Sequence, residues 1–205
     1  MDRRLRNWEV VLVVAVLCLL TAGAWLSREQ GELAERLIRF HVVAHSDRAE
    51  DQELKLAVRD RVLEQARAIY PPDATLEEVY AALEAHLDLL EAAGRAVVEE
   101  EGYAYPVSAR LEQCWFPTKE YNGFALPAGN YTALRVTIGA GEGQNWWCVA
   151  FPPLCLGAAS QTVEAAAQAG LFSEDQTALV TEESGGYMLK FKCMELLGNL
   201  RGLLR

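Results

Sequence analysis

The spacing of hydrophobic and polar residues changes several times along the chain, and each change predicts an element. Residues 10–26 form an apolar run without a charged side chain. Residues 38–44 are short, β-branched and flanked by charge, which is typical of a strand. Apolar side chains then recur every three or four positions through residues 54–69, which indicates a helix that ends at Pro71 and Pro72.

Two helix starts show the spacing of a capping box, Asp47 with Glu50 and Thr75 with Glu78. The second of these helices carries its own apolar stripe until Gly102 stops it. We therefore expect two adjacent antiparallel helices after the first strand.

Beyond the helices the period shortens to two residues. Apolar and polar side chains alternate at 107–112 and at 134–138, and residues 146–151 and 187–191 are further strand candidates. Together with the helices, these strands predict an α+β fold, in which a mainly antiparallel sheet carries the helices on one face.

The same pattern divides the chain into four parts. Residues 1–26 precede a folded core at 36–156. Residues 157–186, rich in Ala, Gln, Ser and Glu, form a variable connection with a weak helix, and residues 187–205 add a last strand and helix to the same domain.

The N-terminal part is typical of a targeting segment. Arg3, Arg4 and Arg6 precede the apolar run, so this flank is expected to stay in the cytoplasm while the rest crosses the membrane. An A-x-A pattern ends at Ala24, which permits cleavage of a signal peptide. Residues 10–26 are also long enough for a retained signal anchor, and both outcomes stay open.

Composition and charge exclude several classes of protein. Of 205 residues, 51% are apolar, so the chain can bury a core and is not globally disordered. Its formal charge of −10 opposes non-specific binding to nucleic acid and to an anionic membrane surface.

Candidate metal and phosphate sites are weak. His41 and His45 lie four residues apart, but His86 is the remaining histidine and belongs to a helical stripe, so no metal ligand set is predicted. The glycine-rich residues 139–143 lack the Lys-Ser/Thr and the helix of a phosphate-binding loop, which leaves a flexible hairpin loop as the interpretation. No cofactor is predicted.

The cysteines allow two interpretations. A cysteine nucleophile would pair Cys148 or Cys155 with His45, and a disulfide or a buried thiol is the alternative.

Two groups of side chains are candidates for binding. Trp146 and Trp147 are adjacent in a strand, so one indole points to each face and one of them can serve as an interface anchor or a sugar-stacking platform. Core packing of both indoles is the other interpretation. On the first helix, a polar strip is either a solvated face or a charged docking strip; it consists of Asp51, Lys55, Arg59 and Asp60.

Four segments together resemble the stage II sporulation protein R family. They are VVAHSD at 42–47, DQELKLAVRDRVL at 51–63, WFPTKEY at 115–121 and LPAGNYTALRVTIGAGEGQNWWCVAFPPLC at 126–155. The chain departs from the family pattern at His45, where Asn is expected, and at Cys114, where an aromatic residue is usual.

The resemblance implies a function and a location. Proteins of this family are made in the forespore and exported into the space between the forespore and mother-cell membranes. There they act as a signal that triggers a membrane-embedded aspartic protease, stage II sporulation protein GA, to process pro-sigma-E. The signal is not an enzyme and needs no cofactor. Cys148 and Cys155 match the family motif, which implies a disulfide between them.

We expect the partner to be recognised by Trp146 or Trp147 together with Trp115 and Lys119. A polar second choice comprises Asp47, Arg59 and Asp60. Two rival functions use the same residues: a cell-wall glycan-binding module would use the indoles, and an envelope hydrolase would use a cysteine.

Overall fold

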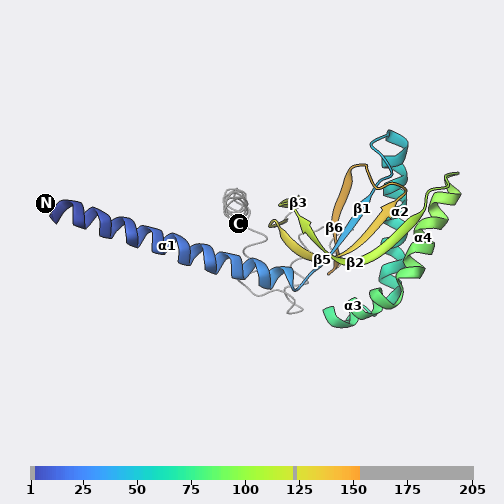
Figure 1. Ribbon diagram of the computed structural model, residues 1–205. Helices are drawn as coiled ribbons and strands as arrows, with labels where there is room; N and C mark the ends of the chain where they lie inside the picture. Colours follow the sequence, from blue (N-terminus) through green and yellow to red (C-terminus); the bar gives the residue numbers. More distant parts are fainter. Residues whose placement is uncertain (1–2, 122–123, 153–205) are drawn as a thin grey trace.

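The computed structural model describes residues 3–121 and 124–152 (Figure 1). A long N-terminal helix is followed by a strand, three helices and five further strands. The elements are α1 (Arg3–Ala34), β1 (Ile38–Val43), α2 (Ala49–Ile69), α3 (Leu76–Ala85), α4 (Leu87–Glu100), β2 (Val107–Phe116), β3 (Lys119–Tyr121), β4 (Phe124–Leu126), β5 (Gly129–Ile138) and β6 (Asn145–Phe151). The α+β class is confirmed.

The main sheet is mixed, whereas the sequence predicts a mainly antiparallel one. Its strand order is β2-β5-β1-β6, with antiparallel β2–β5 and β1–β6 pairs and a parallel β1–β5 pair at the centre. The parallel pair arises because β1 lies between β5 and β6, which are consecutive in the chain. The connection from β5 to β6 therefore passes over the end of β1.

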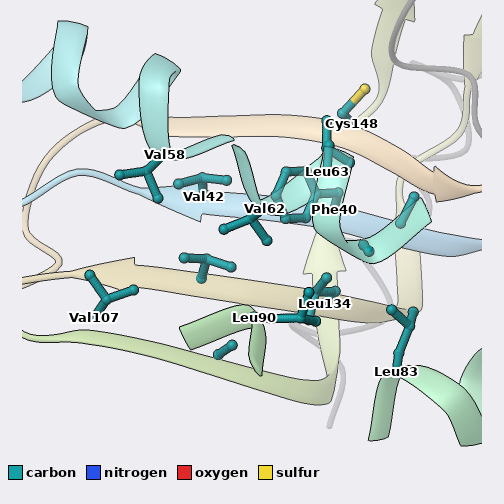
Figure 2. Close-up of a cluster of buried hydrophobic side chains, with 14 of the residues drawn as sticks. Phe40, Val42, Val58, Val62, Leu63, Leu83, Leu90, Val107, Leu134 and Cys148 are labelled. Carbon is teal, nitrogen blue, oxygen red and sulfur yellow. The ribbon is translucent and has the colours of Figure 1, made fainter. Parts of the chain in front are cut away.

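The helices α2, α3 and α4 lie on one side of the main sheet, as predicted (Figure 1). We call this side the helix face and the other side the second face. All six residues of β1 are buried. Ile38, Phe40 and Val42 belong to the core under the helices, while the alternating Arg39 and His41 are buried on the second face. Figure 2 shows Val42 near Val58 and Val62 of α2, and Leu134 next to Leu90 of α4.

The second predicted helix is in fact two helices. His86 interrupts it with φ −125° and ψ 25°, values outside the α-helical region, and its backbone N–H bonds to the Leu83 carbonyl three residues back. Leu83 of α3 and Leu90 of α4 are both fully buried in the core on either side of this break.

The predicted capping box at Thr75 is confirmed. The Thr75 hydroxyl accepts a hydrogen bond from the Glu78 backbone N–H at 3.3 Å, and the Glu78 carboxylate accepts one from the Thr75 backbone N–H at 2.8 Å. The pairing satisfies two N–H groups that the start of α3 leaves without partners inside the helix.

The second face has a smaller core of its own. Leu33, near the end of α1, packs there with Leu37, and the short β3–β4 hairpin contributes Leu126. This hairpin is not evident from the sequence, because strands of three residues carry too few positions to show a period. Over the described residues, no helix is both long enough and apolar enough to cross a membrane. The predicted C-terminal strand and helix lie outside the described residues.

Candidate functional site

Two loops meet at the end of β1. The segment 44–47 follows β1, and the glycine-rich segment 139–144 connects β5 to β6. The Gly143 backbone N–H donates to the Ala44 carbonyl at 3.0 Å, and the Glu142 N–H donates to the His45 carbonyl at 3.3 Å. The glycine-rich segment is therefore not the hairpin loop expected from the sequence. The glycine-rich segment passes over the end of β1, and these hydrogen bonds hold it against the residues that follow β1.

The glycines permit this close approach. A Cβ on Gly143 would lie 2.2 Å from the Ser46 carbonyl oxygen, and a Cβ on Gly139 would lie 2.3 Å from His45 Nδ1. Gly139 also has φ +59°, in the left-handed region that side chains other than glycine disfavour. A residue with a side chain at either position would separate the two loops.

Asp47 fixes the loop rather than the helix. Its Oδ1 accepts a hydrogen bond from the Gln144 backbone N–H at 2.7 Å. The capping box predicted for Asp47 and Glu50 is wrong, since α2 begins after Arg48 and its cap has no side-chain hydrogen bond. Because the crossing loop lies against the segment that follows β1, the Asp47 carboxylate has a donor in that loop.

Two charged residues of the predicted polar strip are buried, which contradicts a wholly solvated helix face. Asp51 accepts a hydrogen bond from the Ser46 hydroxyl, and only 2% of Asp51 is exposed. Lys55 donates from Nζ to the Gln144 carbonyl at 3.0 Å. Burial lowers the pKa of Lys55. Both side chains therefore join α2 to the loops instead of facing water.

Further along α2, Arg59 of the predicted polar strip contacts the Trp146 indole. The Arg59 guanidinium lies over the Trp146 ring, 4.4 Å from its centroid, and Arg59 Nη2 pairs with Asp60 Oδ1 at 2.7 Å. Trp146 remains 37% exposed. We call Asp47, Arg59, Asp60 and Trp146 the Trp146 surface. This surface combines Trp146, one of the two predicted indoles, with the predicted polar group of Asp47, Arg59 and Asp60. The two loops that are hydrogen-bonded to each other hold it in place.

Trp147 points to the second face, so the prediction that the two indoles face opposite sides is confirmed. It stacks on His41 with centroids 4.0 Å apart and meets Phe116 edge-on at 4.8 Å. Burial lowers the pKa of His41 to about 4, and it outweighs the Asn145 side chain, which favours the protonated ring. Trp147 is half-buried and contributes to packing.

Trp115 and Lys119 lie elsewhere. Trp115 is 53% exposed on β2, while Trp146 is on β6 at the other edge of the sheet. Three strand spacings of about 4.8 Å separate these strands. When the strand pairings are followed across the sheet, Trp146 of β6 is aligned with Ala109 of β2. Trp115 lies six positions beyond Ala109 along β2. Lys119 is half-buried in β3. The predicted aromatic cluster is therefore not one surface.

A buried arginine was missed by the sequence analysis. Arg39 is fully buried on the second face, where Nε donates to the Cys148 carbonyl at 3.0 Å and Nη2 donates to the Tyr121 hydroxyl at 2.8 Å. Its guanidinium lies 4.3 Å from the Phe116 ring centroid. Burial lowers the pKa of Arg39. The sequence signal for such a residue is a charged side chain between apolar residues of a central strand.

The remaining histidine and cysteine candidates show structural contacts. His45 Nδ1 accepts a hydrogen bond from the Ala140 N–H at 2.9 Å, and its ring stacks on Tyr105. Within residues 3–121 and 124–152, no group of three or more potential metal ligands comes together. Burial raises the pKa of Cys114 to about 11, which keeps it a thiol at neutral pH.

Cys148 is buried at the edge of the helix-face core, and its sulfur is not a free thiol in the structure. Cys155 lies outside the described residues. The Cys148–Cys155 pairing therefore stays a prediction.

Comparison with known proteins identifies a family for most of the described residues. The model of the family described as stage II sporulation protein R matches residues 34–161, from the end of α1 past β6. The chain belongs to this family. A stage II sporulation protein R from Bacillus subtilis (strain 168) is 32% identical over 158 residues, which are 72% of this chain and 70% of the relative. No solved structure matches the chain.

Membership of the stage II sporulation protein R family supports a role in sporulation. The match spans both interlocked loops, α2 and β6, and so includes the whole Trp146 surface. It leaves out nearly all of α1 and the chain beyond residue 161.

Proposed function

We propose that this chain is a non-catalytic signalling protein of endospore formation, exported from the forespore into the space between the two membranes. There it binds a membrane-embedded aspartic protease of the mother cell, stage II sporulation protein GA, and promotes processing of pro-sigma-E. Membership of the family supports the proposal, and the basic and apolar N-terminal residues support export.

The Trp146 surface carries the proposal. An indole that is 37% exposed, with the Arg59 guanidinium over its ring and Asp60 paired to that guanidinium, combines apolar area with directional polar groups. Aromatic residues and arginines dominate the energetics of protein interfaces. The surface is also rigid, because Asp47 and Lys55 both bind the segment that leads into β6. A rigid surface loses little conformational entropy when a partner binds.

The described nucleophile candidates favour binding over catalysis. The raised pKa of Cys114 disfavours the thiolate that covalent catalysis requires. His45, the base of the rival cysteine hydrolase, already accepts a backbone hydrogen bond through Nδ1 and stacks on Tyr105. Cys148 is buried and not a free thiol.

A signal of this kind acts by differential affinity. The chain shifts the protease toward its active state only to the extent that it binds that state more tightly than the resting state. Loss of a central contact on the Trp146 surface therefore weakens both binding and activation.

The test compares two exposed indoles. Full-length chain in neutral detergent is titrated against the purified protease, as wild type and as Trp146→Ala and Trp115→Ala variants. We expect Trp146→Ala to weaken binding by about 30-fold, equivalent to about 2 kcal/mol for an aromatic hot spot. Trp115→Ala is the matched control and is expected to bind within about twofold of wild type, as surface positions outside a hot spot do.

Two results would reject the assignment. Wild-type affinity in a folded Trp146→Ala variant would remove this surface from the interface. A large loss in Trp115→Ala alone would move the interface to the β2 edge. Circular dichroism of each variant establishes that it is folded.

A further inference from the structure

The second face carries an unusual pair of like charges. Arg110 of β2 lies directly opposite Arg135 of β5. Ser108 and Thr137 form the next directly opposite pair on the same face. Directly opposite residues of an antiparallel pair point to the same face, with Cβ atoms about 5 Å apart, and like charges there are destabilising. The two guanidiniums therefore need negative charge nearby.

Among residues 3–121 and 124–152, Glu112 supplies only part of that charge. Glu112 accepts a hydrogen bond from Arg135 Nη1 at 3.0 Å, and this bond lowers the pKa of Glu112. Arg110 is exposed and, among the described residues, makes no hydrogen bond or ion pair. The buried Arg39 guanidinium adds a third positive charge on the same face. In a chain of formal charge −10, this region is locally cationic.

The neighbouring His41 is consistent with that positive potential. His41 pairs with Arg135 in the β1–β5 register. Burial is the main cause of its low pKa, and the charges of Arg135 and Arg39 act in the same direction.

The same residues enclose a depression of about 240 Å³. Its lining combines two guanidiniums and two hydroxyls with one carboxylate: Ser108, Arg110, Glu112, Arg135 and Thr137. Arg135 Nε is buried and has no hydrogen-bond partner within the part of the chain that the structure describes. Planar guanidinium donors match the geometry of a carboxylate, and the hydroxyls add further donors.

We propose that this depression binds a carboxylate side chain from an acidic segment of a partner protein. One carboxylate between Arg110 and Arg135 would balance the charge that Glu112 leaves on this pair, and Arg39 does not line the depression. A phosphate dianion would bring a second negative charge close to Glu112, which disfavours it. The site lies on the opposite face of the sheet from the Trp146 surface, so it does not depend on the proposed receptor contact.

The test uses a short peptide as the probe. A fluorescein-labelled peptide containing three consecutive Glu residues is titrated with full-length chain in neutral detergent at low salt, and anisotropy reports binding. Arg110→Gln is expected to weaken binding by at least about tenfold, because it removes a charge-assisted contact. Arg95→Gln removes an exposed positive charge from α4 on the helix face and is expected to change affinity by less than about twofold.

Each outcome bears on the proposal. Binding by wild type that depends on Arg110 but not on Arg95, and that a Gln-containing peptide fails to reproduce, supports it. Absence of binding by wild type, or equal effects of the two substitutions, overturns it. Displacement of the peptide by inorganic phosphate at a lower concentration than by acetate assigns the site to phosphate instead, and also overturns it.

Discussion

Replacing Gly143 with Ala is expected to break the contact between the two loops that position the Trp146 surface. The new Cβ would lie 2.2 Å from the Ser46 carbonyl oxygen and 2.5 Å from its carbonyl carbon. Both are backbone atoms, so no side-chain rotation can relieve the clash. The φ angle of Gly143 is not in the left-handed region, which makes the steric clash the single cause of the effect.

The magnitude follows from the hydrogen bonds that the shifted loop loses. Gly143 N–H donates to the Ala44 carbonyl, Gln144 N–H donates to Asp47, and the Gln144 carbonyl accepts from Lys55. At about 1 kcal/mol of net stabilisation for each bond, the variant should lose about 3 kcal/mol of unfolding free energy. The loss is larger if the buried Lys55 ammonium keeps no other acceptor than Gln52.

Urea unfolding of the full-length chain in neutral detergent, followed by tryptophan fluorescence, measures this loss. Gly31→Ala is the control, because a Cβ on Gly31 of α1 meets no atom within 4 Å. Alanine is favoured over glycine inside a helix by up to about 1 kcal/mol, so the control should be neutral or slightly stabilised. A Gly143→Ala variant within about 0.5 kcal/mol of wild type, the range of an ordinary surface substitution, would refute the interlock.

Two further predictions concern His41 and the cysteines. Because the pKa of His41 falls from its ordinary 6.5 to about 4 on folding, the unfolded chain binds the proton first as pH falls between these values. This uptake removes about 3 kcal/mol of stability across that window, and His41→Phe should lack this part of the pH dependence; parallel pH profiles of unfolding free energy would contradict it. Cys148→Ser and Cys155→Ser should each lose at least about 2–3 kcal/mol in unfolding experiments, whereas a Cys155→Ser variant as stable as wild type would argue against a disulfide.

Local patterns predicted the parts of the site that depend on one strand or one helix. Alternation placed Trp146 and Trp147 on opposite faces, because side-chain direction in a strand has a strict period of two. Spacing of four residues aligned Lys55 with Arg59 on α2. The sequence also provided the glycine-rich segment, but not the reason for its glycines.

That reason depends on strand order, which no local pattern encodes. The segment that contains Gly143 crosses β1 because β5 and β6 pair with β1 on opposite sides. This crossing also buried Lys55, which helical spacing alone places on a polar face. The distance between Trp115 and Trp146 likewise follows from their strands lying at opposite edges of the sheet.

Arg39 and His86 were missed for different reasons. An arginine inside an apolar strand satisfies its donors through residues distant in sequence, here Tyr121 and the Cys148 carbonyl. The apolar spacing continues across His86 as in a single helix, so the pattern does not show the interruption there.

The central claim is that this chain activates a protease by binding and performs no chemistry itself. Reconstitution of full-length chain with the membrane-embedded protease and its pro-sigma-E substrate tests it most directly, with cleavage followed by gel electrophoresis. The account predicts cleavage when wild-type chain and protease are both present, no cleavage by the chain alone, and strongly reduced cleavage with folded Trp146→Ala. Cleavage by the protease that is equally fast without the chain, or cleavage by the chain in the absence of the protease, would contradict the account.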